Sequence, residues 1–130
     1  MDAIQLNPSV LAFVGDGVYG LLVREKLADT NRRSGDLHSL SVRLVNATAQ
    51  SKAYEIIKDD LDETEISVFK RGRNLHTNNN PKNSSKAEYH TATGLEALFG
   101  YLHLLGEFER IDQLFSAAYP DKEDEITEKQ

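Results

Sequence analysis

The chain is 130 residues long and 39% of them are hydrophobic, which suits a single domain with a buried core. It contains no cysteine, so disulfide bridges, zinc sites built on thiolates and catalysis by a cysteine nucleophile are excluded. Its formal net charge is −6 at pH 7, and because it shows neither a signal-peptide pattern nor an apolar run as long as a membrane span, we expect a cytoplasmic protein with no membrane partner.

Helix signals dominate the first half of the chain. Asn7 followed by proline is typical of a helix start, and apolar residues then recur at spacings of three and four. This pattern predicts a helix over Pro8–Ala28. A polar connector over residues 29–35 should separate it from a second helix, which the spacing of apolar residues predicts from about Asp36 to Asp59.

The second half of the chain contains two capping-box patterns, at residues 62–65 and 85–88. The first predicts the start of a short helix, which a loop over residues 76–84 should follow. The second predicts a longer helix that continues until Gly106 stops it. A last helix should cover residues 107–119 before a proline ends it.

No stretch shows the sustained period-two alternation that is typical of a half-buried strand. The predicted fold class is therefore all-α, with five or six helices. We expect residues 1–120 to form the domain. Residues 121–130, which carry five acidic and two basic side chains, should form a charged tail.

Two predicted helices each place one carboxylate among small and apolar residues. Asp16 lies within residues 11–18, and Glu96 lies within residues 92–100. A carboxylate in such surroundings is costly unless it is paired, hydrogen-bonded or bound to a metal. Two of them on neighbouring helices indicate a divalent-cation site. The alternative interpretation is that each acid is bonded to a neighbouring arginine or hydroxyl group.

The surroundings of Asp16 in its helix are unusual. At 100° per residue it points almost opposite an apolar stripe formed by Val10, Val14, Val18 and Leu21. This arrangement predicts a helix enclosed on more than one side, like the central helix of a bundle. Gly15, Gly17 and Gly20 lie close by, and each costs a helix interior about 1 kcal/mol relative to alanine. Close approach of another backbone or of a ligand would explain them.

Although the chain is acidic overall, residues 66–87 contain no acidic side chain. Three cations in the four residues that begin at Lys70, followed by an asparagine, suit contacts with a phosphate backbone. The candidates for these contacts are Lys70, Arg71, Arg73, Asn74, Lys82 and Lys86. The alternative is a solvated basic face. Since the total charge is negative, we expect modest binding that salt weakens.

Four segments occur in an order that resembles a known family. They are residues 11–19 with Gly-Asp-Gly, 36–38 with Asp-Leu-His, 70–74 with Lys-Arg-Gly-Arg-Asn, and 93–102 with Glu-Ala-Leu. Together they resemble the catalytic domain of the ribonuclease III family. The best match is its compact bacterial branch, Mini-ribonuclease III, which lacks a separate domain for binding double-stranded RNA. The resemblance covers residues 6–119.

This resemblance implies an all-helical homodimer that cleaves double-stranded RNA with Mg²⁺, for which Mn²⁺ would substitute. It implies that Asp16 and Glu96 are the catalytic metal ligands, and that Lys70–Asn74 and the loop after it approach the RNA. It also implies a role in maturation of precursor 23S (large-subunit) ribosomal RNA. A ribosomal protein that presents the substrate would be a further partner.

The chain departs from the larger ribonuclease III enzymes at two positions. Ser9 and Thr93 stand where those enzymes have Glu and Asp, and the compact branch also lacks acids there. The departure leaves each centre with two protein carboxylates, so metal binding should rely more on water and substrate oxygens. It also leaves open the alternative of a non-catalytic helical dimer that binds structured RNA or a ribosomal partner.

Overall fold

The computed structural model describes residues 5–28, 33–75 and 85–120. Over these residues the chain forms six α-helices, a 3₁₀ turn over Lys58–Asp60 and no strand, which confirms the predicted all-α fold class. The helices are α1 (Pro8–Ala28), α2 (Ser34–Leu44), α3 (Ala47–Ile57), α4 (Glu63–Arg73), α5 (Lys86–Leu104) and α6 (Phe108–Ala118). Among the helices so described, none is long and apolar enough to cross a lipid bilayer.

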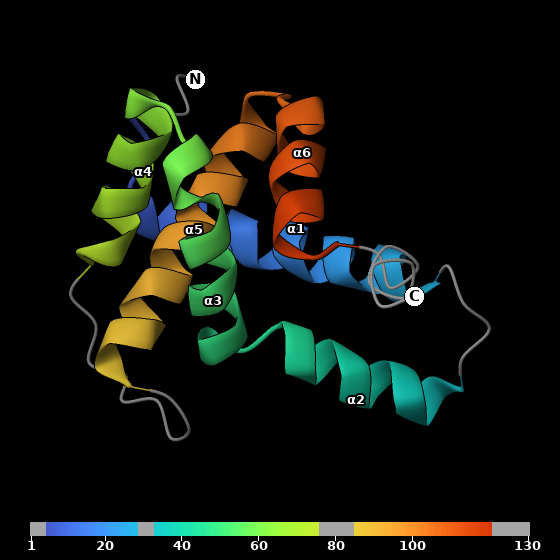
Figure 1. Cartoon of the computed structure of the whole chain (residues 1–130). Coiled ribbons are helices and arrows are strands. Elements are labelled where there is room, and N and C mark those ends of the chain that lie inside the picture. The colour runs from blue at the N-terminus through green and yellow to red at the C-terminus, as the bar shows by residue number, and fades with distance from the viewer. Residues whose placement is uncertain (1–4, 29–32, 76–84, 121–130) are drawn as a thin grey trace.

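The central element of the fold is α5. It packs against α1, α3, α4 and α6, while α2 lies to one side and contacts mainly α1 (Figure 1). Nearly the whole second half of α5, Ala97–Leu102, is buried, because neighbouring helices cover it on several sides. The hydrophobic core therefore surrounds α5, and the other elements are positioned by their contacts with it.

The first helix has the predicted bounds but not the predicted surroundings. It buries a single ridge of residues at four-residue spacing: Leu11, Gly15, Tyr19, Val23 and Leu27. Val10 and Leu21 of the predicted apolar stripe are exposed, and so is Phe13. The expectation that this helix is enclosed like the centre of a bundle is therefore wrong for the single chain. The ridge that contains Gly15 is buried instead, because this glycine allows a close approach to α5.

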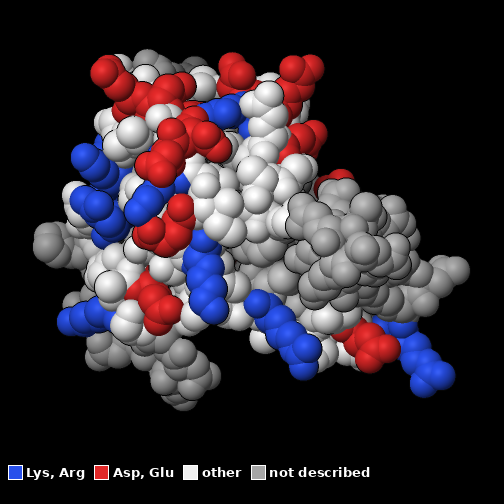
Figure 2. Space-filling view, in the orientation of Figure 1, with Lys and Arg blue, Asp and Glu red and all other residues white. Residues whose placement is uncertain are grey.

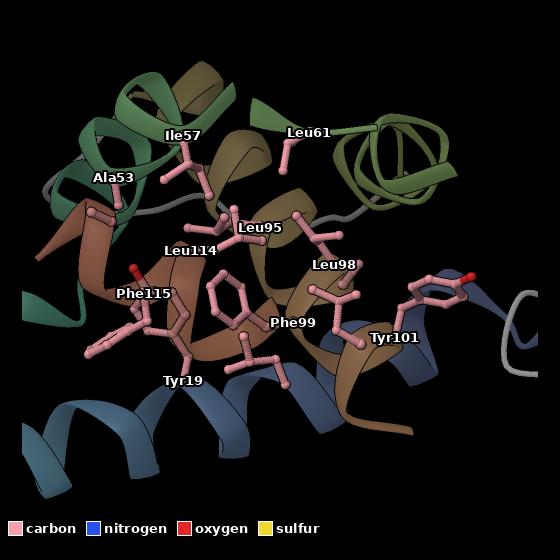
Figure 3. Close-up of a cluster of buried hydrophobic side chains, with 14 of the residues drawn as sticks. Tyr19, Ala53, Ile57, Leu61, Leu95, Leu98, Phe99, Tyr101, Leu114 and Phe115 are labelled. Atoms are coloured by element: carbon pink, nitrogen blue, oxygen red, sulfur yellow. The ribbon is translucent and has the colours of Figure 1, made fainter. Parts of the chain in front are cut away.

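Aromatic rings fill the core between α1, α5 and α6 (Figure 3). Tyr19 makes edge-to-face contacts with Phe99 and Phe115, at centroid distances of 5.2 and 5.9 Å. Its hydroxyl lies 2.6 Å from that of Tyr119, which in turn donates to the carbonyl oxygen of Leu44 at 3.1 Å. The Tyr19 hydroxyl therefore donates to Tyr119, and this chain of bonds fastens α6 and the end of α2 to α1.

The predicted helix from Asp36 to Asp59 is in fact two helices. The break falls at Val45 and Asn46, where the side chain of Asn46 accepts a hydrogen bond from the Ala49 N–H at 2.8 Å and caps α3. A 3₁₀ turn over Lys58–Asp60 follows α3. The prediction of one continuous helix was wrong because both halves carry apolar residues at helical spacing, which hides the capping asparagine between them.

Both predicted capping boxes are confirmed, at Asp62–Glu65 before α4 and at Ser85–Glu88 before α5. Gly106 ends α5 with a φ of 77°, a conformation that favours glycine, and the last helix follows it as predicted. The loop predicted over residues 76–84 and the tail predicted over 121–130 lie outside the described residues.

A buried ion pair joins α4 to α6. Glu65 is 3% exposed, and its two carboxylate oxygens accept hydrogen bonds of 2.8 Å from Nε and Nη2 of Arg110. Burial alone would raise the pKa of Glu65, but the bonds from Arg110 and from the Asp62 N–H hold that pKa below its usual value. The folded state therefore gains stability from this carboxylate above its ordinary pKa and loses it as the pH falls through the lowered one.

Replacing Arg110 with methionine should lower the free energy of unfolding at pH 7 by about 3 kcal/mol, because Glu65 would be left buried without its partner. The deficit should shrink at acidic pH, where Glu65 becomes protonated. Urea denaturation at several pH values measures both effects. Lys58→Met is the matched control, since Lys58 pairs with Glu55 at 2.7 Å on the surface, and it should leave the free energy of unfolding nearly unchanged. Equal losses in the two variants would contradict this assignment.

Candidate active site

Two glycines let the backbones of α1 and α5 touch where the helices cross. A Cβ atom on Gly15 would overlap the carbonyl oxygen of Glu96, and one on Gly100 would overlap the carbonyl oxygen of Leu11. The predicted reason for glycine near Asp16, close approach of another backbone, is therefore confirmed for Gly15. Around Gly17 there is nothing within 4 Å of such a Cβ in the described part of the chain. The crossing fixes the position of Asp16 relative to Glu96.

The structure brings the two predicted carboxylates together at this crossing. Burial is the largest cause that raises the pKa of Glu96, and a hydrogen bond to Asp16 and the charge of Asp16 raise it further, to about 8. Two carboxylates this close repel each other when both are ionised, and a divalent cation between them would remove that repulsion. Asp16 is exposed and Glu96 is half-buried, so the pair is open to solvent on the Asp16 side.

In the described segments the carboxylate pair has no basic partner. Within residues 5–28, 33–75 and 85–120, neither Asp16 nor Glu96 forms an ion pair with a lysine or arginine. The alternative of two acids neutralised by arginines therefore finds no support in these segments. No group of three or more acidic or histidine side chains that could hold a metal occurs in the same segments. The predicted donor set thus consists of two carboxylates, and their role as metal ligands stays a prediction.

The hydroxyl groups at the two positions that lack acids bond to residues close to them in sequence. Thr93 donates its hydroxyl to the carbonyl oxygen of Tyr89 at 3.0 Å. Ser9 donates its hydroxyl to the side-chain oxygen of Asn7 at 2.9 Å. Both hydroxyls are therefore satisfied locally, and neither is shown adding a ligand to the carboxylate pair.

One further polar side chain at the site was not predicted. Gln50 of α3 is 4% exposed, and its side chain lies close enough to Glu96 to oppose the rise in the pKa of that carboxyl. A sequence signal was available, because Gln50 shares a helix face with Ala53 and Ile57, which are both buried. A single polar residue on a core-facing side needs a partner. The pattern alone could not show that the partner would be Glu96.

The predicted RNA-contacting residues lie around the end of α4 and the start of α5. Lys70 and Lys86 are exposed, and so is Asn74, which follows the last residue of α4. Lys82 lies outside the described residues. The three exposed side chains are the ones whose placement fits the predicted contact with a phosphate backbone.

The two arginines of this segment are engaged within the chain. Arg71 is half-buried and donates to the carbonyl oxygen of Leu6 at 2.9 Å. The guanidinium of Arg73 lies over the ring of Phe69, 5.8 Å from its centroid, and its Nε donates to the Asn74 side chain at 3.3 Å. Sequence reasoning could not separate these anchored cations from the exposed lysines, because the difference depends on tertiary contacts.

The basic end of α4 lies beside the part of α5 that carries Glu96. A Cβ on Gly72 would come within 3.0 Å of Gly94 and would also meet Ala97, so α4 packs closely there. Figure 2 shows Lys and Arg on the flank formed by α4, whereas acidic side chains gather at the end of the molecule where α4 and α6 begin. Charge therefore favours approach of a polyanion near Glu96 rather than at the acidic end.

The chain is similar to several known proteins. The model of the family described as "Ribonuclease III domain" matches residues 9–107. "Mini-ribonuclease 3" of Clostridium tetani is 43% identical over 115 residues, covering 87% of this chain and 76% of that protein. The protein of the same name from Symbiobacterium thermophilum is 41% identical over 118 residues, covering 90% and 91%.

A crystal structure of a protein from Fusobacterium nucleatum is also similar. It has a TM-score of 0.78 and 33% sequence identity, covering 85% of this chain and 88% of the other. The match of the family model spans both the helix that carries Asp16 and the helix that carries Glu96. The chain therefore belongs to the ribonuclease III family of endoribonucleases.

Proposed function

We propose that this chain is a Mg²⁺-dependent endoribonuclease that cleaves double-stranded RNA, and that it acts in the cytoplasm on precursor 23S ribosomal RNA. The observation that carries the proposal is the meeting of Asp16 and Glu96 where α1 crosses α5. Carboxylate oxygens are the ligands that Mg²⁺ prefers, and the ion usually keeps several waters, which suits a site with only two protein ligands.

The residues at the site would have distinct roles. Asp16 and Glu96 would hold the ion, which when bound supplies Lewis-acid polarisation of the phosphodiester and makes water more acidic. Asp16 faces solvent, the side from which the substrate can arrive, whereas Glu96 is half-buried and fixed by the helix crossing. Because both side chains lie on packed helices rather than on loops, their geometry should change little when substrate binds.

The basic end of α4 would contact the RNA backbone. A-form RNA is recognised mainly by its shape, its 2′-hydroxyls and its phosphates, so little base specificity is expected from Lys70, Asn74 and Lys86. Arg71 would contribute indirectly, because it ties the residues before α1 to α4 through Leu6.

Lys70→Ala should weaken binding to duplex RNA and flatten the dependence of log K on log salt by roughly 0.9, the loss of one phosphate contact. The reason is that Lys70 is exposed on α4, the helix whose Gly72 packs against α5 at Gly94 and Ala97. Binding titrations at several salt concentrations measure the slope, with Asp16→Asn in both proteins to prevent cleavage. Lys58→Ala, at the acidic end of the molecule, should leave the slope unchanged. An unaltered slope in Lys70→Ala would mean that this basic face is only solvated.

We also propose that two copies of the chain form a homodimer through the outer face of α1. This face exposes Val10, Leu21 and Phe13, the last at 81% exposure. Nothing in the described chain covers Gly17 on the same side, which leaves room for a second backbone. A two-fold dimer would bring two carboxylate pairs together, one for each strand of a duplex.

Phe13→Asp should convert the dimer into a monomer, because it would place a charge in the centre of an apolar interface. Sedimentation equilibrium measures the change in mass. Ile56→Asp is the matched control, since Ile56 is 57% exposed on α3 and away from this face. A Phe13→Asp protein that sediments with the same mass as the unmodified protein would contradict the proposed interface.

Cleavage of duplex RNA tests the proposed activity. The protein should produce fragments from duplex RNA with Mg²⁺ or Mn²⁺ and none with EDTA, and it should cut a stem of precursor 23S ribosomal RNA in preference to an unrelated duplex. Adding ribosomal proteins to the same reaction tests whether one of them presents the substrate. Binding without cutting under all these conditions would overturn the proposal and favour a non-catalytic RNA-binding dimer.

A further inference from the structure

Gln50 presents an unusual polar group beside the carboxylate pair. The residue lies on the buried face of α3, and its side-chain nitrogen Nε2 is buried and makes no hydrogen bond of ordinary geometry in the described chain. A buried donor without a partner costs about 1–3 kcal/mol. A residue that is kept despite this cost is expected to have a role that compensates for it.

The Glu96 carboxyl lies close to this side chain. Gln50 approaches it from α3, and Asp16 approaches it from α1. Glu96 is thus placed between a donor on one helix and a like charge on another. An ionised carboxylate has about four acceptor sites on its two oxygens, so it can accept from an amide and still bind a cation.

We propose that Gln50 is a positioning residue, whose amide donates to the Glu96 carboxylate and holds it in the orientation that binds the divalent cation. The inference rests on the proposed function, because it assigns Glu96 as a metal ligand. Hydrogen bonds from neighbouring groups commonly orient ligating carboxylates, and their loss typically weakens metal binding 10–100-fold. Gln50 itself would contact neither the ion nor the RNA.

Gln50→Met tests the inference, because methionine keeps the length of the side chain and removes the N–H donor. Calorimetric titration with Mg²⁺ in the absence of RNA should show affinity weakened by roughly 10–100-fold, while the melting temperature in EDTA stays near that of the unmodified protein. Gln113→Met makes the same change at an exposed position of α6, where the side chain accepts from Arg110 at 3.3 Å, and should leave the affinity unchanged.

A second measurement avoids any variant. In the unmodified protein, the Nε2 protons of Gln50 should shift and exchange more slowly on addition of Mg²⁺, as seen by nuclear magnetic resonance. Unchanged Mg²⁺ affinity in Gln50→Met, or an amide resonance that does not respond to Mg²⁺, would overturn the positioning role.

The two failures are distinguishable. If the unmodified protein cleaves duplex RNA with Mg²⁺ but Gln50→Met binds the ion equally well, only the role of Gln50 is lost. If the protein binds Mg²⁺ and cuts no RNA, the proposed function fails while the titration still decides the role of Gln50. A protein that binds no Mg²⁺ at millimolar concentrations would overturn both.

Discussion

Replacing Asp16 with asparagine is expected to reduce Mg²⁺-dependent cleavage by about 1,000-fold or more, because the centre would lose one of its two carboxylates and several kcal/mol of transition-state stabilisation. The fold should survive. Asp16 is exposed, and its charge opposes ionisation of Glu96, so the change removes an unfavourable interaction. Single-turnover cleavage of duplex RNA measures the rate, and circular dichroism with thermal melting in EDTA measures the fold.

The matched control is Asp112→Asn, which makes the same change at an exposed position of α6. It should leave cleavage within about twofold, since it lies away from the carboxylate pair and changes the net charge equally. Full Mg²⁺-dependent activity in Asp16→Asn would remove this residue from the mechanism. Loss of activity accompanied by loss of structure would instead show that the residue supports the fold.

The second large effect is expected from Gly100→Ala. A Cβ at this position would overlap the carbonyl oxygen of Leu11 and would lie 2.8 Å from the backbone nitrogen of Gly15. Backbone atoms cannot give way as a flexible side chain can, so α1 must move away from α5. We expect the free energy of unfolding to fall by about 3 kcal/mol or more. In molecules that still fold, cleavage should also fall because Asp16 is displaced from Glu96.

Gly35→Ala serves as the control for this prediction. Nothing in the described residues lies within 4 Å of a Cβ at Gly35, which sits in the first turn of α2. The free energy of unfolding should therefore stay the same or rise by up to about 1 kcal/mol. Urea denaturation compares the two variants directly. A Gly100→Ala protein as stable as Gly35→Ala would show that the close crossing is not required.

Local signals account for the parts of the fold that were predicted well. The proline after Asn7 set the start of α1, and two capping boxes set the starts of α4 and α5. These signals act within one turn of helix, so they can be read without tertiary information. The start of α3 shows the limit, because the cap at Asn46 was present but continuous apolar spacing concealed it.

The buried face of α1 could not be read from apolar spacing. The stripe through Val10 and Leu21 is apolar throughout, but the crossing with α5 selects the ridge through Gly15, where two backbones can touch. The spacing of apolar side chains does not show where a glycine, which has no side chain, allows two helices to pack closely. The exposed stripe then becomes the face that we assign to a second copy of the chain.

The sequence alone indicated the two carboxylates, but it did not indicate which residues surround them in the fold. Asp16 and Glu96 stood out because each lies among apolar neighbours, and the structure places them together. Gln50 and the internal contacts of Arg71 depend on helices that are distant in sequence. Spacing within one helix carries no information about such partners.

The proposed activity depends above all on Asp16 and Glu96 sharing one divalent cation. Crystals of the protein soaked in Mn²⁺ and measured at a wavelength where manganese scatters anomalously would locate the ion. We expect one strong anomalous peak at about 2 Å from a carboxylate oxygen of each residue, absent in Asp16→Asn. No peak between the two carboxylates, with each of them bound to a lysine or arginine instead, would contradict it.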